Sequence, residues 1–161
     1  MTDIIKSKIN NILNEVRKEN IVLNVHDIVM KKLDNDNKDT YYITITYNIT
    51  RYIPYGNDNT KTREAGRDVV LIPYAEKVTG RNDDGDYIEG EWKFDTNINN
   101  RVIKFIEDTL NRPRGGDPDA NKSVQFKGKI YNLPTHQRDL RVAIVAIVNG
   151  LTSQAARKIN N

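Results

Sequence analysis

The sequence contains no cysteine, which excludes several classes of protein. Without cysteine a chain forms no disulfide framework and no thiolate metal site, and it has no cysteine nucleophile. The fold must therefore be held together by packing alone. Only two histidines are present, His26 and His136, and they lie far apart in the sequence. This scarcity argues against a zinc site built from histidines and against a Ser/His/Asp relay.

Long apolar runs are also missing. No segment approaches the roughly 18 apolar residues that a membrane-spanning helix needs. The first residues lack the basic region followed by an apolar one that marks a secretory signal. We therefore expect a soluble, unprocessed, intracellular protein with no membrane contact. With 161 residues and 37% hydrophobic content, residues 1–161 should form a single domain around one core.

The charge is small overall but uneven along the chain. The net charge is +3, yet residues 1–100 hold 14 Lys and Arg against 17 Asp and Glu, while residues 101–161 hold 11 against 5. Such asymmetry is typical of a chain end that faces a polyanion, or of subunits that meet through oppositely charged faces. Scattered, solvated surface charge is the third interpretation, and composition does not distinguish the three.

The spacing of apolar residues predicts an α+β fold, with an antiparallel sheet and a long projecting β-hairpin packed against two to three helices. Thr96 should cap the middle helix and Pro113 should stop it, whereas Pro73 should place its strand at an edge or a bulge. The segment 142–148 also suits a buried strand, but we favour a helix enclosed on all sides. The expected helices are 4–16, 96–110 and 140–159, the expected strands are 41–53, 69–72, 87–94 and 124–131, and a loop is expected at 34–39.

The segment 41–53 gives the strongest signal, because large apolar residues alternate with polar ones throughout it. Thirteen strand residues extend about 44 Å, whereas a compact domain of this length measures about 39 Å across. Together with the polar connection 54–66, this strand should project as an arm over about residues 41–78. The alternative is a long curved sheet wrapped around a helix within a monomer.

A projecting apolar face needs cover, and we expect a second copy of the chain to supply it. Main-chain pairing or arm exchange would give affinity, and alternate side chains would give register. Replacing Ile45 and Tyr47 with aspartate should then abolish assembly and leave the helices formed. The expected subunit-interface residues are Tyr41, Ile43, Ile45, Tyr47, Ile49, Tyr55 and Arg63.

A basic region provides the alternative function, a nucleic-acid-binding module. Basic side chains beside aromatic ones are how single-strand binders combine phosphate contacts with base stacking. Phe126 and Tyr131 are interleaved here and should lie on opposite faces of one strand. The possible DNA-facing residues are Arg112, Arg114, Lys122, Lys127 and Lys129.

No constellation in the sequence predicts catalysis, a metal site or a cofactor. His26-Asp27 is a dyad found in metal phosphohydrolases, but those enzymes need more histidines than this chain has. The acidic turn 82–86 overlays a calcium loop, yet the first ligand position falls on Gly80, which has no carboxylate. No phosphate loop and no GxGxxG after a strand is present. A small enzyme is the least favoured interpretation.

The order of these elements resembles the small neck and tail-completion or tail-terminator ring proteins of tailed bacteriophages. The resemblance lies in the segments 4–16, 41–53, 54–66, 96–110 and 140–159. It implies a non-enzymatic virion protein, assembled in the host cytoplasm as a homo-oligomeric ring whose subunits share sheet edges. Such a ring would dock on portal, neck or tail proteins at the head-to-tail connector, close to packaged DNA. No functional residue carries over, because the family has no sequence signature at these positions.

Overall fold

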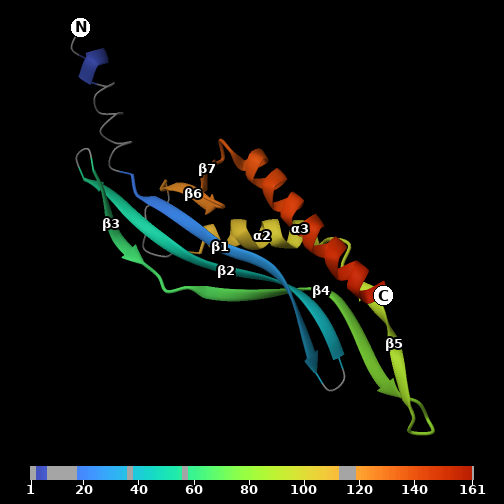
Figure 1. Cartoon of the computed structure of the whole chain (residues 1–161). Coiled ribbons are helices and arrows are strands. Elements are labelled where there is room, and N and C mark those ends of the chain that lie inside the picture. Colours follow the sequence, from blue (N-terminus) through green and yellow to red (C-terminus); the bar gives the residue numbers. More distant parts are fainter. Residues whose placement is uncertain (1–2, 7–17, 36–37, 56–57, 113–118, 161) are drawn as a thin grey trace.

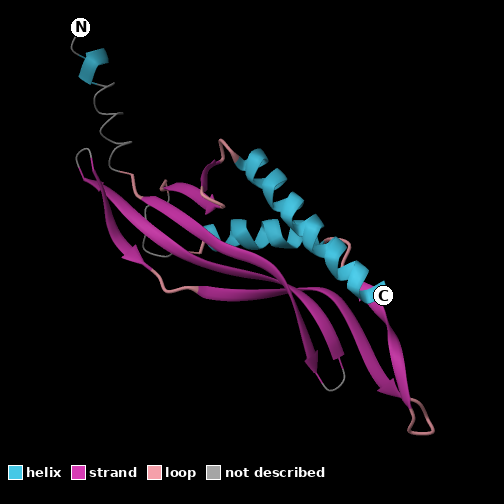
Figure 2. Cartoon of the chain, in the orientation of Figure 1, coloured by secondary structure: helices cyan, strands magenta, loops and turns pink. Residues whose placement is uncertain are grey.

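The computed structural model describes residues 3–6, 18–35, 38–55, 58–112 and 119–160, without the side chains of 54–62 and 89. Within these ranges the fold is mixed α+β, which confirms the predicted class. Helices α2 (Ile98–Leu110) and α3 (Gln137–Asn160) lie on the same face of one sheet (Figures 1 and 2). Of the predicted helix 4–16, residues 4–6 are helical and the remainder lies outside the described residues.

The sheet contains seven described strands in the order β5-β4-β2-β1-β6-β7, and β3 pairs with β2 beyond the start of β4. All neighbours are antiparallel except β1 and β6. The expected purely antiparallel sheet is therefore wrong at this pair, because the chain crosses over through α2 and enters β6 in the direction of β1. The strands are β1 (Asn20–Asn35), β2 (Lys38–Tyr55), β3 (Asp58–Glu64), β4 (Asp68–Arg81), β5 (Tyr87–Phe94), β6 (Asn121–Phe126) and β7 (Lys129–Leu133).

A bulge at His26 explains why the sequence pattern does not predict β1 as one strand. The register with β2 shifts between Val25 and Asp27, so the side-chain alternation changes phase there. As a result both Val25 and Ile28 face the core, although they are three positions apart. The strand continues to Asn35, so the predicted loop at 34–39 is reduced to a short hairpin connection.

The polar connection predicted at 54–66 contains a strand instead. β3 folds back onto the end of β2, from the pair Thr50 and Glu64 to the pair Tyr55 and Asp58. Its sequence, DNTKTRE, has no apolar residue and therefore no hydrophobic alternation to reveal it. The prediction for Pro73 is confirmed, since the register shift between β2 and β4 leaves an extra residue beside it.

The single strand predicted at 124–131 is a hairpin. Lys127 and Gly128 connect β6 to β7 with φ angles of 52° and 75°, the positive values that a two-residue type I′ turn requires. Because the chain reverses there, Phe126 and Tyr131 lie on the same face and not on opposite faces as expected. Both rings are buried.

The two helices follow the prediction closely, with corrections at their ends and exposed face. α2 begins after Asn97 and not at a Thr96 cap, and it ends at Leu110, before Pro113, which lies outside the described residues. The segment 137–160 is helical throughout, as favoured. It is not enclosed on all sides, because Val142 is 63% exposed.

One core joins the sheet to both helices. Side chains from β1, β2 and β6 pack against the inner faces of α2 and α3, and each large apolar side chain contributes about 1.5–3 kcal/mol when fully buried. The turn between β4 and β5 lies beyond the C-terminal end of α3 (Figure 1). The most completely buried members are Leu23, Ile43, Ile45, Val102, Ile106, Leu110, Val124, Ile144 and Val148.

A glycine in β5 permits another bulge, opposite Val78 of β4. A Cβ at Gly90 would lie 2.1 Å from the Val78 carbonyl oxygen. We expect Gly90→Ala to cost about 1–3 kcal/mol and to loosen the β4–β5 hairpin. The only tryptophan, Trp92, lies two residues after Gly90, and its ring centroid is 5.5 Å from that of Tyr41. Because a looser hairpin should expose Trp92 to water, its fluorescence emission should shift to the red.

Gly80→Ala is the matched control for this variant. It lies in the same hairpin, and a Cβ there would meet nothing within 4 Å. We expect wild-type emission and stability from Gly80→Ala. Equal behaviour of the two variants would contradict the role given to Gly90.

Candidate assembly surfaces

The predicted interface residues of β2 belong to the chain's own core. Ile43 and Ile45 are 0% exposed beneath the two helices, and Tyr41 is buried in a neighbouring cluster with Ala75 and Ala155. Tyr47 and Ile49 are half-buried against the same core. The prediction that this face needs a second copy is therefore wrong, because α2 and α3 supply its cover.

Two of the predicted interface residues, Tyr55 and Arg63, lie where β2 and β3 pair. Tyr55 lies at the end of β2, and its side chain is outside the described residues. Arg63 is exposed on β3.

Tyr47 also has a packing role, because its ring meets the edge of Phe105 at a centroid distance of 5.3 Å. Burial and the nearby Asp68 raise the Tyr47 pKa, while Arg112 opposes them.

Arg51, the one charge within the apolar alternation of β2, has a structural partner. Its Nε donates to Oε1 of Glu19, a carboxylate that is itself buried. This hydrogen bond raises the pKa of the Arg51 guanidinium. The backbone oxygen of Glu19 accepts from the Asn121 N–H at 2.8 Å. Glu19 thus ties the start of β1 to both β2 and β6.

No described helix or strand covers the face of the sheet opposite α2 and α3, and we name it the bare face. Val29, Thr44 and Leu71 form one row across β1, β2 and β4 by their strand register, and Val69 lies on the same face, 57% exposed. Val29 and Leu71 are exposed too. The hydroxyl of Thr44 is buried and has no hydrogen-bond partner among the described residues. This face therefore combines apolar exposure with an unsatisfied polar group.

A polar network on the bare face accounts for His26. Its Nε2 donates to Asn48 Oδ1 at 2.6 Å, and Asn48 Nδ2 donates to Glu64 Oε1 at 3.3 Å and to the Ala65 carbonyl at 3.1 Å. These bonds hold the β1 bulge to the end of β3. A recess of about 400 Å³ beside the bulge is lined by residues that include His26 and one carboxylate, Asp27. Among the described residues no group of three His, Asp or Glu could hold a metal ion.

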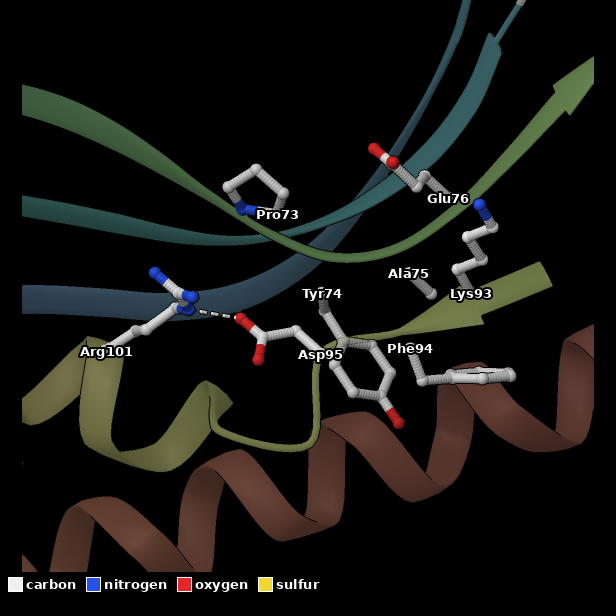
Figure 3. Close-up of a pocket in the computed structure, with 8 residues that line it drawn as sticks. All are labelled: Pro73, Tyr74, Ala75, Glu76, Lys93, Phe94, Asp95 and Arg101. Carbon is white, nitrogen blue, oxygen red and sulfur yellow. Dashed lines mark ion pairs between the residues drawn. The ribbon is translucent and has the colours of Figure 1, made fainter.

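A second recess lies where β4 and β5 meet the start of α2 (Figure 3). It measures about 380 Å³, and the rings of Tyr74 and Phe94 line it with centroids 5.7 Å apart. Burial raises the pKa of Tyr74, and a hydrogen bond with Thr152 lowers it. The charges at the rim are balanced, so the recess favours neither anions nor cations. They are Glu76 and Asp95 against Lys93 and Arg101, with Arg101 paired to Asp95.

The described members of the possible DNA-facing set lie near β6 and β7, where the rings of Phe126 and Tyr131 are not exposed for stacking. Phe126 and Tyr131 are buried in the core, so neither ring is available to a base. Lys127 and Lys129 are exposed. Lys122 donates to Asn111 Oδ1 at 2.5 Å, Arg112 is exposed beside the Phe105 ring, and Arg114 lies outside the described residues.

Two borders of the sheet end in strands that are paired on one side only. Among the described strands, β5 pairs with β4 alone and β7 with β6 alone. In β4, residues 68–73 pair with β2 on one side and with no described strand on the other, because β5 pairs with β4 only from Ala75 onward. Unpaired strand edges are templates for pairing with another chain. Sequence reasoning missed these edges, because strand order is not encoded in periodicity.

Comparison with known proteins adds no functional information to this geometry. In the described part of the chain, no helix is long and apolar enough to cross a membrane. The chain matches no family model, no curated protein and no solved structure.

Proposed function

We propose that this chain is a non-enzymatic assembly subunit that forms a homo-oligomeric ring. The observation that carries the proposal is the unfinished sheet. One face is bare, the exposed side chains of Val69 and Leu71 lie on it, and the adjoining edge of β4 has no described partner. A second copy that covered this border would bury the apolar side chains and pair the free backbone groups.

The location within a virion is the finer part of the proposal. A ring at the head-to-tail connector of a tailed bacteriophage, docked on portal, neck or tail proteins, is supported by the resemblance of element order. The structure departs from the expected contact surface, because the β2 face assigned to neighbouring copies is buried. We therefore move the proposed contacts from that face to the borders of the sheet.

A nucleic-acid-binding module is the second candidate, and the basic side chains of Lys127 and Lys129 are what favours it. Burial of Phe126 and Tyr131 removes the stacking that would give such a module its base contacts. Salt-dependent retention on immobilised DNA would show that phosphate contacts alone suffice.

Replacing Val69 and Leu71 with aspartate should reduce assembly and leave the monomer folded. Both side chains are exposed in the isolated chain, so the variant should lose about 1 kcal/mol of stability or less. In the ring the same carboxylates would be buried without partners, which costs several kcal/mol per interface. Light scattering after size exclusion measures the molar mass, and circular dichroism checks the fold.

The matched control is Val142→Asp. Val142 is a comparably exposed valine on α3, outside the β4 border. It should leave the molar mass of the assembly unchanged. If the Val69 and Leu71 variant assembles as the wild-type chain does, the β4 border is not a subunit contact.

A further inference from the structure

The two strands that end the sheet order, β5 and β7, lie in segments of opposite net charge. Residues 82–91, the β4–β5 turn and most of β5, contain five acidic residues and no basic one. Residues 121–133, which make β6 and β7, contain three lysines and no acidic residue. In Figure 1 the β4–β5 turn lies at one end of the molecule, and β6 and β7 lie toward the other.

Both strands also expose apolar side chains beside their free edges. Tyr87 is 73% exposed and Ile88 is exposed on β5, while Ile130 is 55% exposed on β7. Lys127 in the turn and Lys129 at the start of β7 both precede Ile130 in the sequence. Each strand therefore offers backbone groups for pairing and apolar area for burial. β7 carries Lys129 as its only charge, whereas β5 carries Glu89 and Glu91 against Lys93.

The charges disfavour pairing between identical edges. Two β5 edges would bring together two acidic turns and two strands of net negative charge, although each strand also carries Lys93. Two β7 edges would bring lysines together, and like charges across a strand pair are destabilising. The unlike pairing, β5 against β7, turns the same charges into attractive contacts and a long-range steering term. Charge therefore selects a head-to-tail contact over a two-fold symmetric one.

We infer that copies of this chain associate head to tail, with the acidic β5 edge of one copy pairing with the basic β7 edge of the next. The inference rests on the proposed function and extends its contact surface from the open edge of β4 to the adjacent β5 edge and to the β7 edge of the next copy. Because the two edges are different surfaces, the contact is heterologous, and repeated rotation by one angle closes it into a ring. The sheet of each copy would then continue into the sheet of its neighbour.

Charge reversal tests this contact directly. The acidic edge is reversed with Asp86→Lys and Glu91→Lys, and the basic edge with Lys127→Glu and Lys129→Glu. All four side chains are exposed, and Glu at position 127 meets the same positive φ as Lys. Each variant alone should raise the protein concentration needed for assembly about tenfold or more.

Rescue separates a specific contact from a general loss of stability. A chain that carries all four reversals should assemble as the wild-type chain does, because its edges are complementary again. An equimolar mixture of the two reversed variants should also assemble, in alternating order. Arg138→Glu with Lys158→Glu reverses two exposed charges on α3 and should have no effect.

Cross-linking provides a second readout that does not depend on charge. The chain has no cysteine, so Ile88→Cys and Ile130→Cys introduce the only thiols. A short bis-maleimide should join the double variant into a ladder of trimers and larger species. Either single variant should remain monomeric after treatment, because the head-to-tail contact places no second thiol opposite the one that each copy carries.

The outcomes distinguish the inference from the proposed function. Wild-type rings that survive both charge reversals, or a cross-linked double variant that stops at dimers, would overturn the β5–β7 contact while the ring remains. Loss of retention on immobilised DNA by Lys127→Glu with Lys129→Glu, at unchanged molar mass, would assign β7 to nucleic acid and overturn the contact too. A wild-type chain that stays monomeric would contradict the proposed function itself.

Discussion

Replacing Ile45 with aspartate should unfold the isolated chain. Ile45 is 0% exposed and packs between the sheet and both helices. Removing a buried side chain of this size costs about 2–5 kcal/mol, and a carboxylate in its place adds the cost of a buried, unpaired charge. The total stability of a domain is about 5–15 kcal/mol. We expect the cooperative transition in urea, followed by circular dichroism and Trp92 emission, to be lost.

Val69→Asp is the control that gives this result its meaning. Val69 neighbours the same part of β2 through its pair with Thr46, but it lies on the bare face, 57% exposed. This variant should retain a wild-type transition to within about 1 kcal/mol. An Ile45→Asp chain that keeps its helices and loses only its assembly would restore β2 as the subunit interface.

Replacing Arg51 with alanine should cost about 3–5 kcal/mol, because it removes the guanidinium that pairs with the buried Glu19 carboxylate. The exposed fraction of the Glu19 side chain is 7% and that of Arg51 is 19%. Loss of this pair should also release the start of β1, where Glu19 accepts from Asn121 of β6. The midpoint of urea unfolding measures the effect.

Two further variants make the Arg51 result specific. Arg51→Ala combined with Glu19→Gln removes the charge that would be left in the core, so it should be more stable than Arg51→Ala alone. Lys104→Ala breaks an exposed i,i+4 pair with Asp108 at 3.8 Å and should cost about 0.5 kcal/mol or less. If Arg51→Ala costs no more than Lys104→Ala, the buried pair contributes nothing measurable.

Periodicity predicted the elements that carry a clear apolar pattern. The strand at 41–53 and the helices at 96–110 and 140–159 were predicted because their buried residues recur at the expected spacing. β3 was missed because its sequence has no apolar residue. The bulge at His26 and the turn at Lys127-Gly128 were missed because each changes the phase of the side-chain alternation, and no single residue type marks such a position.

The candidate contact surface was predicted less well, for a different physical reason. The alternation of Tyr41, Ile43 and Ile45 shows that one face must be buried, but it does not show which partner covers it. In the structure α2 and α3 provide the cover. The residues now proposed for contacts lie at borders that depend on strand order, and strand order follows from long-range pairing. The sequence shows the uneven charge distribution, but only the folded chain shows that the acidic segment and the basic segment lie at opposite borders of the sheet.

The most direct test of the account is the mass of the wild-type chain in native mass spectrometry, with light scattering across a salt series as support. The monomer has a mass of 18.5 kDa. We expect one closed oligomer of defined copy number at low ionic strength, which weakens as salt screens the contact between β5 and β7. A single species of 18.5 kDa at every concentration and salt condition would contradict the claim that copies of this chain complete the sheet.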